Sequence, residues 1–296
     1  MIGALHAGGA TAHHDLAGAW SLDPLVLAAA AAGVVLYAVG WRRLRRRGRP
    51  DLADGRRAAL FAAGVAVLLL SVLSPLDPVG EEYLLSGHML QHVLLGDVAP
   101  LLIVLGIAGP LALFAVPRPL LRGVGRSPRL RAVARFLTRP LAAVVLWVAV
   151  TALWHVPVAF EYALAHRWAH DLEHATMFVA GFAVWLHIAA AIPRARLSGA
   201  RRSAMAAGLL AVGMVVSTTI FLSDPLYDVY VAQEERLFGL TPTGDQVRAA
   251  MLMTTEQTLT LGVAAMLLLW NHVERVAARS REELAAEAAA ERAGAD

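Results

Sequence analysis

The 296-residue sequence contains no cysteine and no lysine. Without cysteine the chain can form no disulfide, no CxxC redox pair and no thiolate metal site. All 26 basic residues are arginines, and only 17% of the residues are charged, against 58% that are hydrophobic. A soluble domain of this length is nearer half apolar and a quarter charged. The composition therefore indicates a membrane protein.

The arginines are distributed in a way that argues against nucleic-acid binding. An isoelectric point near 9.8 could suggest such a partner. However, the basic residues occur in short clusters between apolar runs rather than along one polar segment. We therefore expect a lipid bilayer around the chain and no nucleic acid.

Long apolar runs recur, each long enough to cross a bilayer core that needs about 20 helical residues. They predict an all-α membrane protein, a bundle of seven transmembrane helices. The expected spans are residues 24–41, 58–74, 87–107, 141–159, 170–192, 204–222 and 245–270. The predicted domains are an extracytoplasmic N-terminal segment, a seven-helix transmembrane domain and a cytoplasmic polar tail, at residues 1–23, 24–272 and 273–296.

The positions of the arginines predict the orientation of this bundle. Twenty-three of the 26 fall in alternate connections or in the tail, at residues 42–57, 118–139, 193–203 and beyond 271. The positive-inside rule then places the N-terminus outside and the C-terminus in the cytoplasm. Residues 1–19 lack the basic start of a signal peptide, so we expect the first span to direct its own insertion.

Histidines gather on the side that this topology places outside. Nine of the eleven lie there: His6, His13, His14, His88, His92, His155, His166, His170 and His174. Pairs four residues apart, at the starts of the third and fifth spans, put two rings on one helix face. Neutral imidazole is a good ligand for copper, zinc and iron. The predicted metal ligands are His88, His92, His155, His170 and His174.

Other interpretations of these residues stay open. Each histidine pair could hydrogen-bond a neighbouring helix, or opposing histidines could be the axial ligands of a haem. Glu161, Asp171 and Glu173 could orient histidine ligands. Met89 and Met177 are either soft ligands for Cu(I) or packing residues.

Two further carboxyl groups fall inside predicted spans. Asp97 lies near the middle of the third span, where a charge is costly, so we expect it to be paired, protonated or involved in proton handling. Glu256 lies in the outer half of the last span and could face the histidines. A permease would need a continuous polar path, for which Asp97 and His187 are too sparse.

Enzymatic catalysis is not expected. The sequence contains no nucleophile elbow, no P-loop and no HExxH motif. His170 and His174 have the spacing of a zinc protease, but Asp171 stands where the catalytic glutamate is required. A purely structural role in an assembly remains an alternative.

Several short runs resemble the cytochrome c oxidase assembly factors of the CtaG type that are associated with caa3 oxidases. The most specific are HMLQH at residues 88–92 and HDLEH at residues 170–174. WHVP at residues 154–157 is a further match, and PLY at 225–227 with Asp245-Gln246 is a weaker one.

The resemblance extends over residues 83–270 and implies a multi-pass protein of the bacterial cytoplasmic membrane that matures a haem–copper oxidase. Its partners would be cytochrome c oxidase subunits, and its chemistry copper supply or insertion. Two positions depart from the family pattern: Leu101 replaces a second proline, and Asp97 an apolar residue. We therefore predict a non-enzymatic assembly factor that binds or delivers copper, with zinc or haem as less favoured ligands. The alternative is a bis-His haem-binding membrane redox protein.

Overall fold

The computed structural model of this protein describes residues 18–107, 109, 111, 114, 116–190 and 197–294. The predictions for His6, His13 and His14 lie outside the described residues. Within those ranges the chain forms helices and no strand. The segments are α1 (Pro24–Arg46), η2 (Pro50–Leu52), α2 (Gly55–Leu73), α3 (Leu76–Pro78), η3 (Val79–Tyr83), α4 (Leu85–Val93), η4 (Leu94–Val98), α5 (Ala99–Ile107), α7 (Arg118–Arg126), α8 (Pro128–Leu137), α9 (Pro140–Trp154), α10 (Pro157–Ala165), α11 (Arg167–Ile188), α12 (Gly199–Leu222), α13 (Asp228–Val231), η6 (Leu237–Gly239), α14 (Pro242–Gln257), η7 (Thr258–Gly262) and α15 (Val263–Gly294).

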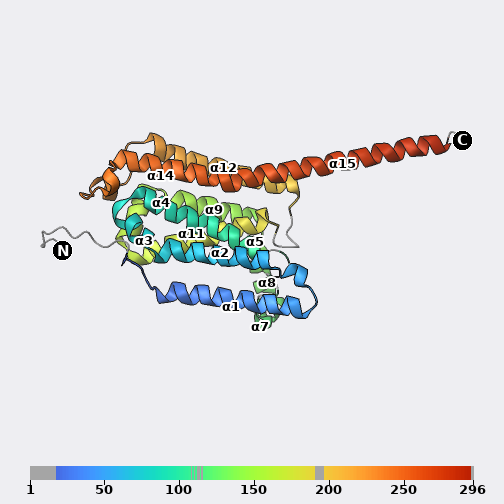
Figure 1. Ribbon diagram of the computed structural model, residues 1–296, viewed down its shortest axis with the longest axis horizontal. Helices are drawn as coiled ribbons and strands as arrows, with labels where there is room; N and C mark the ends of the chain where they lie inside the picture. The colour runs from blue at the N-terminus through green and yellow to red at the C-terminus, as the bar shows by residue number, and fades with distance from the viewer. Residues whose placement is uncertain are drawn as a thin grey trace.

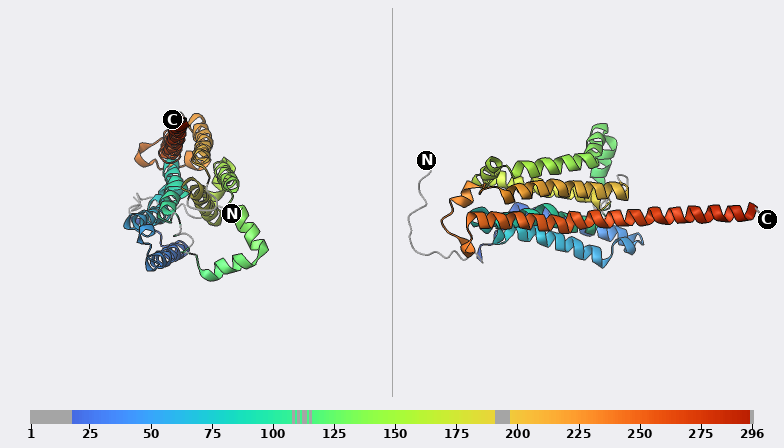
Figure 2. Two further views of the ribbon diagram at one scale, coloured as in Figure 1. Left: turned by 90° about the vertical axis from the view of Figure 1, so that its right-hand side faces the viewer. Right: turned by 90° about the horizontal axis from the view of Figure 1, so that it is seen from above.

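The long helices run side by side and form a bundle (Figure 1). α1 begins at one end of this bundle, and α15 leaves it at the other end as a long projecting helix (Figure 1). α7 and α8 project from the side of the bundle at the end from which α15 leaves (Figure 2). The predicted polar tail is thus helical as far as Gly294.

Five helices of the described residues are long and apolar enough to cross a membrane: Pro24–Arg46, Pro50–Leu73, Leu85–Ile107, Gly199–Leu222 and Pro242–Glu287. A sixth crossing is possible if Pro128–Phe136 and Pro140–Trp154, bent by 62°, form one span. The all-α architecture, with several helices suited to cross a membrane, is therefore confirmed. The seven crossings and their orientation stay predictions. α11, which contains most of the predicted fifth crossing, is not among these five helices, and it carries charged and histidine residues in its first turns.

Polar caps and prolines determine where helices begin. Asp23 accepts hydrogen bonds from the backbone N–H groups of Leu25, at 2.8 Å, and Val26, at 3.1 Å. Pro24 occupies the first helical position, where the missing N–H costs nothing. Side-chain acceptance of this kind satisfies the free N–H groups of a helix start, so α1 begins where the sequence predicts its first span.

The fourth expected span, residues 141–159, is divided in the structure. α9 ends at Trp154, and the separate helix α10 begins at Pro157. Proline has no N–H to donate and disfavours the helical conformation in the residue before it. The apolar run therefore contains a break that its hydropathy alone does not indicate.

The third span lies at the centre of the bundle. Half of an apolar 18-residue stretch within Leu85–Ile107 is buried, whereas only 6% of the corresponding stretch of α1 is. Its middle part, η4, packs against α11. A Cβ atom on Gly181 of α11 would overlap the backbone carbonyl of Gly96 in η4. The approach of these two segments therefore requires glycine at position 181.

We expect Gly181→Ala to destabilise the bundle by about 1–3 kcal/mol, because the added methyl group overpacks the contact between α11 and η4. The measurement is the thermal unfolding midpoint of the detergent-solubilised protein, followed by tryptophan fluorescence. Gly208→Ala is the matched control, since a Cβ at this helical position of α12 meets nothing within 4 Å among the described residues. The control should keep or raise the midpoint, and a Gly181→Ala midpoint equal to that of the control would contradict the contact.

Candidate metal centre

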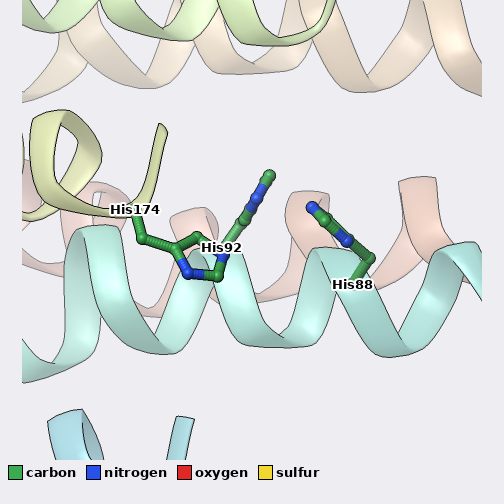
Figure 3. Close-up of side chains that lie close together, drawn as sticks. All are labelled: His88, His92 and His174. Atoms are coloured by element: carbon green, nitrogen blue, oxygen red, sulfur yellow. The ribbon is translucent and has the colours of Figure 1, made fainter. Parts of the chain in front are cut away.

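Three imidazole rings from two helices gather at the end of the bundle where α4 and α11 begin. His88 and His92 extend from α4 and His174 from α11 toward a common space (Figure 3). One possible ligand nitrogen from each ring lies within 4.8 Å of the other two. All three residues are buried, and the rings of His88 and His92 are 4.2 Å apart between centroids.

A second group overlaps the first. Ligand atoms of His88, His170 and Glu173 also lie within 4.8 Å of one another. The ring centroids of His170 and His174 are 4.1 Å apart. Glu173, which directly precedes His174 in α11, is fully buried. The term His cluster is used below for the set of His88, His92, His170, His174 and Glu173.

The polar atoms of the His cluster have few partners. Within the described chain, neither ring nitrogen of His88 or His92 and neither carboxylate oxygen of Glu173 makes a hydrogen bond. Nε2 of His92 lies 3.5 Å from Oε1 of Glu173. The Gly80 carbonyl interacts with the His88 ring and also accepts a hydrogen bond from the Tyr230 hydroxyl at 2.6 Å. Buried polar atoms of this kind are costly without a partner, so the cluster is suited to a ligand.

Glu81 orients His170. Nδ1 of His170 lies 2.9 Å from Oε1 of Glu81, so it carries the hydrogen, and Nε2 keeps its lone pair. Burial opposes ionisation of Glu81, but the hydrogen bond from His170 and the charge of Arg167 outweigh it and lower the pKa of this carboxyl group. A carboxylate that fixes the tautomer of a histidine is a common support for metal ligands.

Gly80 permits Glu81 to reach this position. A Cβ atom at residue 80 would lie 2.9 Å from both Cα and N of His88. A side chain at residue 80 would therefore push the η3 segment away from the first turn of α4. The glycine keeps η3, with Glu81, against the start of the helix that carries His88 and His92.

His155 lies beside the His cluster rather than in it. Its Nδ1 donates a hydrogen bond to the carbonyl of Thr151 at 2.8 Å, which leaves Nε2 with a free lone pair. The ring centroid is 6.2 Å from that of His92, and His155 is in neither of the two close groups found in the described chain. The structure thus brings four of the five predicted histidines together.

The three predicted orienting carboxylates take different positions. Asp171 is paired with Arg167 at 3.1 Å and is exposed. Glu161 accepts a hydrogen bond from the backbone N–H of Asp228 at 2.6 Å. Only Glu173 lies among the histidines. The sequence did not identify Glu81; its only clue was an acidic pair just before the third span.

Asp245 anchors the start of α4. Its carboxylate accepts hydrogen bonds from the backbone N–H groups of Leu85, at 2.7 Å, and Ser86, at 3.2 Å, and from the Ser86 hydroxyl. Because Asp245 belongs to α14, this contact joins α14 to the helix that carries His88 and His92. Asp245 belonged to the weaker sequence match, which did not indicate this role.

Gln91 fixes α4 against α2. Its amide nitrogen donates to the carbonyl of Ser71 at 2.9 Å and to Asp77 at 2.5 Å. Burial and the charge of Glu81 raise the pKa of Asp77, although the hydrogen bond from Gln91 acts in the opposite direction. The glutamine inside the HMLQH run therefore ties the helix that carries His88 and His92 to α2 and α3.

The fold and the site define a helical membrane protein with a buried polyhistidine cluster between two of its helices. The family model described as cytochrome c oxidase caa3 assembly factor matches residues 35–275. The chain belongs to this family of caa3 oxidase assembly factors.

The curated relatives are longer than this chain. "Uncharacterized protein Mb0105" of Mycobacterium bovis and "Uncharacterized protein MT0111" of Mycobacterium tuberculosis are each 33% identical to it over 175 residues. "Uncharacterized protein ML1998" of Mycobacterium leprae is 27% identical over 172 residues. Each match covers 55% of this chain and only 25% of the relative. No solved structure matches the chain.

We expect Asp245→Asn to destabilise the protein by about 1–3 kcal/mol, because the amide NH2 group would face donors that now share a carboxylate. The thermal midpoint in detergent measures the effect. Asp224→Asn is the control, since Asp224 is exposed and only its backbone carbonyl accepts a described hydrogen bond. Equal midpoints for the two variants would contradict the anchoring role of Asp245.

Proposed function

We propose that this chain helps to mature a caa3-type haem–copper oxidase by holding a copper ion in the His cluster. The observation that carries the proposal is the approach of His88, His92 and His174 to within 4.8 Å through buried ring nitrogens. Metal–imidazole bonds are about 2 Å long, so ligands of one ion lie about 4 Å or less apart. Small side-chain rotations would bring these nitrogens into range.

The donor set favours a copper ion over a magnesium or calcium ion. Hard cations prefer oxygen ligands, whereas imidazole nitrogen suits copper and zinc. Copper is also the metal that the proposed client contains. The proposed role is binding and transfer rather than catalysis. The histidines would release the ion more readily than a closed cage of thiolates.

The seven predicted crossings are part of this proposal. α11 would be the crossing that carries the ligands His170 and His174, and its buried polar turns account for its lower apolarity. The arginine-rich α7 and α8 lie at the end of the bundle opposite the start of α4 (Figure 1). The positive-inside rule therefore supports an outward-facing His cluster, in a bacterial cytoplasmic membrane with cytochrome c oxidase subunits as partners.

Replacing His88 and His92 of α4 with leucine, an apolar residue of similar size, tests the proposal. We expect His88→Leu/His92→Leu to weaken Cu(II) binding by about 100-fold or more, because the ion would lose two of three close ligands. Equilibrium dialysis of the detergent-purified protein, with copper measured by elemental analysis, gives the affinity. Oxidase maturation in cells that carry the variant should fail in parallel.

The control is His187→Leu, which replaces a buried histidine near the other end of α11. It should leave copper affinity and oxidase maturation unchanged. A wild-type protein that binds no copper, or a folded double variant that binds it as tightly as the wild type, would overturn the proposal.

Haem binding is the second candidate, and one observation favours it. An apolar cavity of about 420 Å³ borders His170 and His174, within the range of roughly 300–1,000 Å³ that is usual for ligand pockets. Both histidines lie on α11, however, whereas bis-His ligation takes one ligand from each side of the macrocycle. We expect haem titration to give no Soret shift, and a shift that His170→Leu abolishes would favour haem instead.

A further inference from the structure

A small cavity lies next to the His cluster, farther along α4 and α11. It has a volume of about 60 Å³, more than the roughly 10–15 Å³ that a single water-sized occupant needs. Its metal-binding and charged lining groups belong to His92, His155, Met177, Met253, Asp97 and Glu256. The function proposed above assigns no role to the two methionines or to the two deeper carboxyl groups.

Imidazole and thioether groups line one part of this cavity. The Nε2 atom of His155 is buried, and no described residue is its hydrogen-bond partner. Met177 and Met253 are 8% and 3% exposed, so their sulfur atoms lie in the interior. Thioether sulfur is a soft, polarizable donor, and soft donors select Cu(I).

A carboxyl pair lines another part of the cavity. Asp97 accepts a hydrogen bond from the Thr260 hydroxyl at 2.8 Å and another from the Trp185 indole N–H. The side chain of Glu256 interacts with that of Asp97. Two carboxylates side by side in an apolar interior repel each other strongly, so the pair is expected to keep one proton and one negative charge. The donors to Asp97 favour the charge on this residue.

Two π-helical segments meet beside this pair. Asp97 lies in η4, and Thr260 lies in η7, which follows directly after the end of α14 at Gln257. A π-helical turn changes the direction of the following side chains, and such turns often occur at functional sites. The spans Leu85–Ile107 and Pro242–Glu287 each contain one of these π-helical segments, and the Asp97–Thr260 hydrogen bond joins the two segments.

We propose that this cavity is a second cation subsite, which binds Cu(I) through His155, Met177 and Met253. The single negative charge of the Asp97–Glu256 pair balances the single positive charge of the ion. A cation buried in a membrane protein needs such compensation. The inference rests on the proposed function, since an ion would reach this inner subsite from the adjacent His cluster through His92, which borders both.

Counting bound Cu(I) tests the inner subsite. The full-length protein in detergent is titrated with Cu(I) under reducing, anaerobic conditions against a chromogenic Cu(I) chelator. We expect two ions for the wild type and one for Met177→Leu/Met253→Leu, because leucine keeps the side-chain volume but removes the sulfur. Met89→Leu is the matched control, since Met89 is fully buried but does not line the cavity, and it should still bind two ions.

X-ray absorption at the copper edge gives a second measurement that does not depend on stoichiometry. A copper–sulfur distance should be present in the loaded wild type and in Met89→Leu. It should be absent from Met177→Leu/Met253→Leu. Since the chain has no cysteine, methionine is the only protein source of sulfur.

The outcomes separate this inference from the proposed function. If the methionine double variant keeps two ions, or the wild type binds one ion that the methionine variant keeps and His88→Leu/His92→Leu abolishes, the inner subsite is wrong and the His cluster stands. If the wild type binds one ion that only the methionine variant loses, the His cluster fails and the inner subsite stands. A wild type that binds no Cu(I) overturns both.

The charge balance has its own test. Asp97→Asn is expected to weaken the inner Cu(I) by about tenfold or more, because the ion loses a nearby opposite charge in an environment of low dielectric constant. Affinity is measured by the same chelator competition. Unchanged affinity at the inner subsite would contradict the role of the carboxyl pair.

Discussion

The cost of burying imidazole nitrogens without partners is the constraint on which the rest of this structure depends. A buried polar group left without a hydrogen bond costs about 1–3 kcal/mol, and a folded domain is stable by only about 5–15 kcal/mol. The His cluster contains several such atoms within the described chain. One metal ion could accept lone pairs from both α4 and α11, and this would remove the cost at several atoms together.

The surrounding contacts hold the rings in place from outside the cluster. Asp245 joins the first turn of α4 to α14, and Gln91 joins the same helix to α2. Glu81 fixes the tautomer of His170 from the η3 segment. Of these contacts only that of Glu81 uses a ring nitrogen, Nδ1 of His170, so they position the histidines without competing for the other ring nitrogens. The site therefore depends on polar contacts between segments that are distant in sequence.

Helical periodicity accounts for how much of this site could be predicted. The four-residue spacing of His88 and His92 places both rings on one face, and α4 has that arrangement. The spacing gives no information on how far α4 and α11 are rotated toward each other, so the separate position of His155 could not be predicted. The contact of Glu81 with His170 could not be predicted either, because it joins η3 to α11, two segments that are distant in sequence. Apolar runs likewise predicted the spans but not the π-helical turns η4 and η7 inside two of them.

The central claim is that imidazoles from α4 and α11 bind the same ion. Pulsed electron paramagnetic resonance of the purified protein loaded with one equivalent of Cu(II) tests it most directly, because the remote nitrogen of each coordinated imidazole modulates the signal. The account predicts modulation from at least three imidazoles, reduced by one in a His174→Leu variant. A spectrum with one imidazole or none, or one that His174→Leu leaves unchanged, would contradict it.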